Sequence, residues 1–252
     1  MNRNGGGRAR DRESGLVAVT FDFWGTLYEN AYVRDERLHI LERVLERNGQ
    51  PRAWESLEAA YGHARSVWDR VWRQEQRSIP IARWLDELLG HLEASLSDDA
   101  AAALGREIEE AYLHSNVPRP VDGVCDVLPA LAQRYAVGLI SDTGLTPGRV
   151  LRQVMARDRL LSLFDALTFS DELGIAKPSP EPFLHTLEHL GARPEQGAHI
   201  GDLPETDIRG ARSVGMRAVL FLGVSHREDG RDLADAAFEH YDELEHLLAR
   251  LE

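Results

Sequence analysis

The sequence predicts an α/β protein: a doubly wound, Rossmann-like parallel sheet of about five strands, with an inserted α-helical cap domain. Three observations support this: short apolar runs rich in Leu, Val and Ala, helical patterns between those runs, and one long stretch without strands. Strands that alternate with helices are typical of a parallel sheet covered on both faces. Right-handed crossovers then give a doubly wound fold, with functional groups at the carboxyl ends of the strands.

Five apolar runs are predicted to be buried strands. In chain order they are residues 16–22, 137–141, 166–170, 197–202 and 218–223. Helical patterns fall between them, at residues 124–135, 147–158, 180–190 and 204–214. This order predicts the repeated strand–helix units of a parallel sheet.

Residues 31–117 lack a convincing strand and predict three or four amphipathic helices. One of these covers residues 54–76, where apolar side chains recur at helical spacing. Pro118 and Pro120 mark the return to the sheet. We therefore expect a helical cap at 31–117, an α/β core formed by 16–30 and 118–252, and a disordered tail at 1–15. Segments near 28–30 and 117–120 are expected to act as hinges.

Composition and charge exclude several classes of protein. The net charge is −13 and no long basic run occurs, so neither nucleic acid nor an anionic membrane surface is an expected partner. Cys125 is the only cysteine, which excludes an intrachain disulfide and fits a reducing cytosol. No apolar stretch approaches the roughly 18 residues of a membrane span. We expect a cytoplasmic protein with a small-molecule substrate, and the sequence leaves a homodimer open.

Side chains suited to chemistry stand at the ends of four predicted strands. They are, in order, Asp22, Ser141, Lys177, and Asp202 with Asp207. Taken singly, Asp22 is better explained as the cap of a turn. Asp202 with Asp207 is equally well explained as a helix cap, and Ser141 equally well as a helix N-cap. The carboxyl ends of parallel strands meet at one edge of the sheet, so these residues are expected to share a pocket.

Each residue type in this set suits a phosphate or metal site. A serine hydroxyl at a helix start, with free amides beside it, forms a cradle for an anion. Lys177 is the only lysine among the 29 Lys and Arg residues, and a fixed ammonium there would balance carboxylates or hold a phosphate. The oxygens of Asp202 and Asp207 suit a hard cation such as Mg²⁺.

With these motifs the chain resembles the haloacid dehalogenase superfamily with a type 1 helical cap, over residues 16 to about 222. The matching segments are Asp22 to Leu27, Ser141, Lys177-Pro178, and Gly201-Asp202 with Asp207. The resemblance implies Asp22 as nucleophile, with Ser141 and Lys177 holding the transferring group. It also implies Mg²⁺ bound by Asp22, the main-chain carbonyl of Trp24, and Asp202, with Asp207 as a ligand or a supporting carboxylate. The residues expected to meet the substrate are Trp24, Gly25, Thr26, Asp142 and Thr143.

The sequence departs from the phosphatases of this superfamily at Trp24. Those enzymes carry a second Asp there, which protonates the leaving alkoxide and later deprotonates water. Loss of a general acid–base typically lowers the rate by about 10² to 10⁴. A substitute donor would have to come from elsewhere, and the candidates are Asp142, Glu29, Asp171 and Glu172.

Three interpretations of the substitution remain. The favoured one is a Mg²⁺-dependent hydrolase of a small phosphorylated metabolite, with a substitute acid or a leaving group that needs no proton. The second is carbon–halogen hydrolysis, because haloacid dehalogenases carry an aromatic residue at this position; the acidic Asp202 and Asp207 argue against it. The third is a catalytically impaired binding protein. Schiff-base chemistry through a cap lysine is excluded, because residues 31–117 contain no lysine.

Four of the five tryptophans, Trp54, Trp68, Trp72 and Trp84, lie in the helical stretch. An aromatic substrate pocket would explain them, but so would the core of a small helical domain. Their helical spacing favours the packing role.

Overall fold

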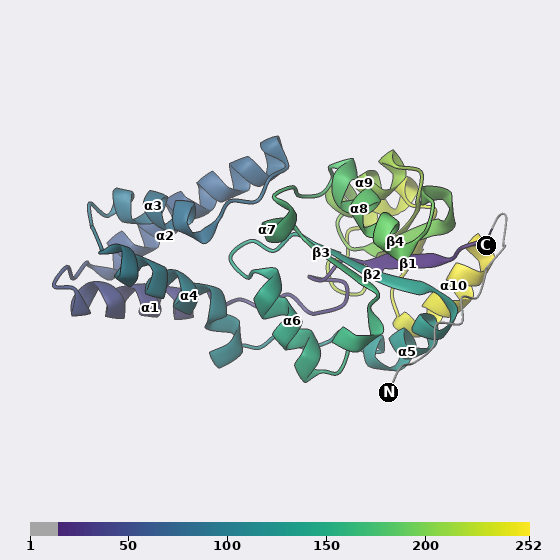
Figure 1. Ribbon diagram of the computed structural model, residues 1–252, viewed down its shortest axis with the longest axis horizontal. Coiled ribbons are helices and arrows are strands. Elements are labelled where there is room, and N and C mark those ends of the chain that lie inside the picture. The colour runs from purple at the N-terminus through teal and green to yellow at the C-terminus, as the bar shows by residue number, and fades with distance from the viewer. Residues whose placement is uncertain (1–14) are drawn as a thin grey trace, which may run out of the picture.

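A computed structural model describes residues 15–252, so the expected tail at 1–15 falls almost entirely outside the described part. Six parallel strands form one sheet in the order β3-β2-β1-β4-β5-β6 (Figure 1). Their bounds are β1 Ala18–Phe21, β2 Ala136–Ser141, β3 Ala166–Phe169, β4 Gly197–Gly201, β5 Arg217–Phe221 and β6 Ala236–Phe238. The predicted α/β class is confirmed, and each of the five expected strands forms within two residues of its expected bounds.

The sheet has six strands where the sequence predicted about five. The additional strand, β6, pairs with β5 at the edge of the sheet. It is only three residues long and two of them are alanine, so it has no apolar run to reveal it.

Helices cover both faces of the sheet because successive strand residues point to opposite sides. Val19 and Phe21 of β1 enter one apolar cluster, whereas Ala18 enters another. The first cluster is completed by α5 (Val124–Arg134), α6 (Gly148–Arg157) and α10 (Leu244–Leu251). The second contains side chains of α8 (Pro180–Leu190) and α9 (Arg209–Ser213), as Figure 1 shows above the sheet. The predicted helix at residues 204–214 is a π-helical turn, η4 (Pro204–Ile208), that continues into α9.

The helical stretch forms four α-helices with an apolar cluster of their own, on the side of the molecule away from α10 (Figure 1). They are α1 (Arg34–Arg47), α2 (Trp54–Arg70), α3 (Ile81–His91) and α4 (Asp98–His114). The helix expected at 54–76 is α2 followed by a π-helical turn, η1 (Val71–Glu75), which ends at Gln76 in the left-handed conformation (φ 53°). None of the described helices is long and apolar enough to cross a bilayer.

The two segments that join the helices to the core run side by side. The Glu29 amide donates to the Arg119 carbonyl at 2.9 Å, and the Val121 amide donates to the Leu27 carbonyl at 3.0 Å. Both predicted hinge segments therefore lie at one place in the fold. Their motion stays a prediction.

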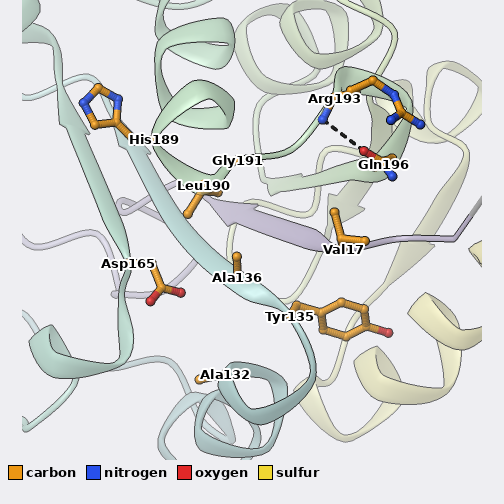
Figure 2. Close-up of a pocket in the computed structure, with 10 residues that line it drawn as sticks. All are labelled: Val17, Ala132, Tyr135, Ala136, Asp165, His189, Leu190, Gly191, Arg193 and Gln196. Carbon is orange, nitrogen blue, oxygen red and sulfur yellow. Dashed lines mark hydrogen bonds between the residues drawn. The ribbon is translucent and has the colours of Figure 1, made fainter. Parts of the chain in front are cut away.

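A cavity of about 670 Å³ lies at the amino ends of the strands, as Figure 2 shows. Val17 precedes β1, Ala136 begins β2, and Asp165 precedes β3. Arg193 and Gln196, joined by a 3.2 Å hydrogen bond in Figure 2, border the start of β4. The cavity is thus on the opposite edge of the sheet from the predicted strand-end residues.

Candidate active site

The predicted strand-end residues converge at the carboxyl edge of the sheet. Asp22 follows β1 at the centre of the sheet, between β2 and β4. Strand order reverses there, and ligands bind at such switch points in open α/β sheets. Lys177 Nζ lies 2.5 Å from Asp22 Oδ1 and donates to the Ile140 carbonyl at 3.0 Å. Asp22 and Lys177 are therefore in direct contact although 155 positions separate them.

A buried polar network holds the lysine. Asp207 Oδ1 lies 2.6 Å from Lys177 Nζ and 3.4 Å from His199 Nε2, and Asp207 Oδ2 accepts from the Leu203 amide at 2.9 Å. His199 Nδ1 in turn lies 2.9 Å from the hydroxyl of Thr20. Both oxygens of Asp207 are thus already occupied by donors. This arrangement fits a carboxylate that positions Lys177.

Three buried carboxylates gather beside this ammonium. Asp22, Asp202 and Asp207 each place one oxygen within 4.8 Å of those of the others. Asp202 Oδ1 is buried and accepts no hydrogen bond from the described residues. The main-chain oxygen of Trp24 likewise accepts none in that part of the chain. Unsatisfied hard oxygens in a tight group are the donor set that Mg²⁺ prefers, so the residues present fit this ion.

The charges in this cluster do not balance. Burial raises the pKa of Asp22 to about 7, with Lys177 opposing and Asp207 adding to the rise. Burial, with repulsion from Asp207 and Asp22, raises the pKa of Asp202 to about 8. Burial would also raise the pKa of Asp207, but Lys177 and His199 outweigh it and hold this pKa below its usual range. One ammonium therefore stabilises one carboxylate fully, and a further cation would be needed to keep all three ionised at neutral pH.

Gly25 allows the loop after Asp22 to lie against the cluster. Its φ is +69°, and a Cβ there would lie 2.8 Å from Cγ of Asp202 and even closer to one of its oxygens. Both the left-handed conformation and the close approach require glycine. Gly25 thus shapes the site through its backbone. It does not line the cavity that lies between the helical stretch and the core loops.

The hydroxyls predicted to meet the substrate differ in availability. Ser141 Oγ and Thr26 Oγ1 are buried and have no hydrogen-bond partner within the described chain. The Thr143 hydroxyl instead lies 3.2 Å from Ser170 Oγ, whose oxygen also accepts from the Thr143 amide at 3.1 Å. Ser141 is therefore free for a ligand, whereas Thr143 is committed to its neighbour.

A cavity of about 330 Å³ lies between the helical stretch and the core loops, and its wall includes Trp24, two positions after Asp22 of the carboxylate cluster. Trp24, Asp142 and Thr143 contribute to its wall, whereas Thr26 does not. The helices supply most of its aromatic side chains: Tyr61, Trp68, Trp84 and Tyr112. The packing role predicted for the tryptophans holds for Trp84, which is fully buried, but Trp84 and Trp68 also face this cavity.

The helical stretch is fastened to the loops that carry the predicted catalytic residues. Trp72 Nε1 donates to Asp142 Oδ2 at 2.9 Å, and the Lys177 amide donates to Asp142 Oδ1 at 3.1 Å. The Ala176 amide donates to the Gln76 carbonyl at 2.8 Å. Asp142 therefore joins the end of α2–η1 to the segment that positions Lys177.

Of the four candidate proton donors, only Asp142 adjoins the cluster. Glu29 and Asp171 are exposed, and Glu172 pairs with Arg152 at the surface. Burial raises the pKa of Asp142 above its usual range. A raised pKa suits an acid, although both oxygens of Asp142 already accept hydrogen bonds.

Sequence reasoning missed Thr20, His199, Trp72 and Arg37. Thr20 and His199 are polar residues in otherwise apolar strands, and they are register partners in the β1–β4 pair. A polar pair inside buried strands signals an internal network, so this contact was detectable in principle. Trp72 and Arg37 carried no such signal, because an arginine or a tryptophan is ordinary in an amphipathic helix and neither contact follows from strand register.

The fold and the site define a doubly wound α/β protein with an aspartate at the end of its central strand and a lysine in contact with that aspartate. Residues 16–215 match the family model of haloacid dehalogenase-like hydrolases, and the chain belongs to this family. It is 33% identical over 210 residues to the glyceraldehyde 3-phosphate phosphatase of Methanopyrus kandleri, covering 81% of this chain and 83% of that one. A phosphoserine phosphatase of Thermus thermophilus is 34% identical over 114 residues, which is 45% of either chain, so this match spans about half of that relative. The crystal structure of a 2-haloacid dehalogenase from Pseudomonas syringae superimposes with a TM-score of 0.71 at 28% identity, covering 94% of this chain and 100% of that chain.

Proposed function

We propose that this hydrolase is a Mg²⁺-dependent phosphohydrolase that uses Asp22 as nucleophile on small organic phosphates whose leaving group departs without a proton. The observation that carries this proposal is the contact of one lysine with two of three clustered carboxylates, beside a tryptophan in the place of the general acid. The acidic cluster supports a cation site, and the phosphatase relatives support a phosphorylated substrate. Residues 31–117 would act as the cap.

In the proposed reaction Asp22, Lys177 and Ser141 have separate roles. Asp22 Oδ2, which has no hydrogen-bond partner among the described residues, attacks phosphorus while Lys177 holds Oδ1. The bond to the leaving oxygen breaks and its electron pair leaves with that oxygen. Water then attacks phosphorus of the aspartyl phosphate, and the bond between phosphorus and the carboxyl oxygen breaks. Both protons of the water leave with the product as dihydrogen phosphate, and the carboxylate is regenerated. Ser141 Oγ would donate to a phosphoryl oxygen, and the ammonium of Lys177 would stabilise the negative charge of the phosphoryl group.

The metal would be held by Asp22, Asp202 and the main-chain oxygen of Trp24, with Asp207 positioning Lys177. When bound, Mg²⁺ supplies charge stabilisation for the phosphoryl oxygens and favours ionised carboxylates. Trp24 can neither donate a proton nor accept one, which restricts efficient substrates to acyl or aryl phosphates.

Carbon–halogen hydrolysis is the second candidate, because a 2-haloacid dehalogenase superimposes over the whole of its own length and an aromatic residue follows the nucleophile. The unsatisfied Asp202 beside Asp22 disfavours it, since a halide departs without needing a cation in the site.

One substrate comparison tests the proposed function. With Mg²⁺ present, we expect release of phosphate from acetyl phosphate to exceed release from glycerol 3-phosphate by about 10²-fold or more, because only the alkyl ester needs a protonated leaving group. Removal of Mg²⁺ with EDTA should abolish both. Chloride release from 2-chloropropionate that survives EDTA would establish dehalogenation instead, and no turnover of any of the three would favour the binding-protein interpretation.

The cluster also predicts how Mg²⁺ binding depends on pH. The folded pKa values of Asp22 and Asp202, about 7 and 8, exceed the ordinary value of 3.8. From pH 3.8 up to these folded values, the metal-free folded state therefore holds more protons than the unfolded chain. Metal-free stability should therefore fall as pH rises through this window. Mg²⁺ binds the ionised forms, so its stabilising effect should grow with pH. Thermal denaturation with and without Mg²⁺ at about pH 6 and about pH 9 measures this. An equal Mg²⁺-induced rise in Tm at the two pH values would contradict it, and Asp202→Asn should lose most of the rise.

A further inference from the structure

Arg37 of α1 is a buried cation without a protein counter-charge. It is 8% exposed, and its Nε donates to the Ile108 carbonyl at 3.0 Å. Its Nη2 donates to the Leu145 carbonyl at 3.1 Å and to the Thr146 hydroxyl at 3.0 Å. Among the described residues, no carboxylate forms a salt bridge with it. Buried arginines are almost always paired with an acid, so this guanidinium has charge left for a ligand.

The free part of this guanidinium opens onto the cavity between the helices and the core. Nη1 makes no hydrogen bond within the described chain and is not enclosed by protein, and Arg37 lines the cavity. Three donors on Nε and Nη2 fix the plane of the group against two core-facing segments. A preorganised guanidinium with two remaining N–H groups is suited to a carboxylate or another planar anion.

The other charged groups of the cavity wall are already partnered. Arg34 pairs with Glu58 at 2.7 Å and Asp35 at 3.1 Å, and Arg65 lies 3.9 Å from Asp69. The one carboxylate in the described wall, Asp142, accepts hydrogen bonds on both oxygens. Arg37 is therefore the charged residue of this wall that remains to bind an anionic ligand.

The rest of the wall suits a flat apolar body. The rings of Trp24 and Tyr112 lie 5.3 Å apart, and the guanidinium of Arg37 lies over Tyr112 at 5.4 Å. Trp68 adds an indole whose buried N–H has no hydrogen-bond partner within the described residues. A dry cavity of about 150 Å³ holds a benzene molecule, so about 330 Å³ accommodates a single substituted ring.

We propose that this cavity binds the leaving group of the substrate, a single planar ring or similarly small apolar body bearing a carboxylate that Nη1 of Arg37 binds. The identification of this ligand as a leaving group rests on the proposed function. Trp24 joins the two sites, because it lies two positions after Asp22 and forms part of the cavity wall. An aryl oxygen leaving from phosphorus would depart without a proton, as the tryptophan at this position requires.

A matched pair of ligands tests the recognition without turnover. Calorimetry in the presence of Mg²⁺ should show 4-hydroxybenzoate binding to the wild-type protein about tenfold or more tightly than 4-hydroxybenzamide, since a hydrogen bond to a charged group contributes that much. Arg37→Gln should abolish the preference and Arg37→Lys should retain part of it. Arg43→Gln, which alters a paired arginine of α1 outside the cavity wall, should leave it unchanged. Equal affinities in the wild type, binding of neither ligand, or a preference that survives in Arg37→Gln would overturn the proposal.

Turnover of the corresponding phosphates separates this inference from the proposed function. We expect kcat/KM for 4-carboxyphenyl phosphate to exceed that for 4-carbamoylphenyl phosphate, through KM, and the excess should vanish in Arg37→Gln. Carboxylate-selective binding with no hydrolysis of either ester would uphold the anion site and reject phosphohydrolysis. Equal hydrolysis of both esters, with rates that Arg37→Gln does not change, would uphold phosphohydrolysis and reject the anion site. The wild-type comparisons stand even if Arg37→Gln fails to fold.

Discussion

Replacing Asp22 by asparagine is expected to lower phosphate release from acetyl phosphate by about 10⁴-fold or more, because the amide cannot form the covalent intermediate. The loss should appear in kcat, measured at saturating Mg²⁺. Binding of beryllofluoride with Mg²⁺, detected as a rise in Tm, should also disappear.

Unfolding would not explain such a loss. The pKa of Asp22 is raised to about 7, so above that pH its ionised form is unfavourable in the metal-free fold. A neutral asparagine should therefore leave metal-free Tm at pH 8 at or above the wild-type value. Glu29→Gln is the matched control, since Glu29 is an exposed carboxylate seven positions later, and it should keep full activity. Substantial activity in Asp22→Asn would remove this residue from the role of nucleophile.

The close approach of Asp22, Lys177 and Asp202 was predictable because it follows mainly from the topology of the sheet. Each follows an apolar strand, and the carboxyl ends of parallel strands must share an edge whatever the side-chain details. The strand bounds needed to be correct only within a residue or two, and they were. The same reasoning predicted the helical insert, because 31–117 is long, amphipathic and free of β-branched runs.

The difference in hydrogen bonding and pKa between Asp202 and Asp207 was not predictable in the same way. Asp202 and Asp207 look equivalent in the sequence, five positions apart after one strand. In the structure, Asp207 is enclosed by Lys177, His199 and the Leu203 amide, and its pKa is held low, whereas Asp202 keeps an unsatisfied oxygen and a raised pKa. Asp202 directly follows β4, whereas Asp207 lies in the π-helical turn η4, and the directions that these two backbones give the side chains are not encoded in a periodic pattern.

The cavity wall was hidden for a related reason. Helical spacing tells which side chains share a face, and it favoured packing for Trp68 and Trp84 without showing that they also line a cavity. Only the way the helices meet the core turns part of that apolar face toward Trp24 and leaves Arg37 without an acid. The proposed ligand cavity is therefore formed by contacts between segments far apart in sequence.

Replacing Trp24 by aspartate is expected to raise hydrolysis of glycerol 3-phosphate by about 10²-fold or more, because it places a proton donor beside the leaving oxygen. Turnover of acetyl phosphate should rise less, since its leaving group needs no proton and only the attack of water gains a base. The ratio of the two rates, measured with Mg²⁺, reports the gain independently of protein concentration.

The gain in activity of Trp24→Asp should come with a loss of thermal stability, and a second variant separates the two effects. Trp24 packs edge-to-face on Phe23 at 4.8 Å and against Tyr112 at 5.3 Å, so its removal opens the cavity wall and should lower Tm. Trp24→Asn has nearly the same size as the aspartate variant and loses the same contacts, but it has no proton to give. If the two variants hydrolyse glycerol 3-phosphate equally, the wider cavity explains the gain and the missing acid does not. If only aspartate restores activity, the tryptophan is what limits this hydrolase to leaving groups that depart unprotonated.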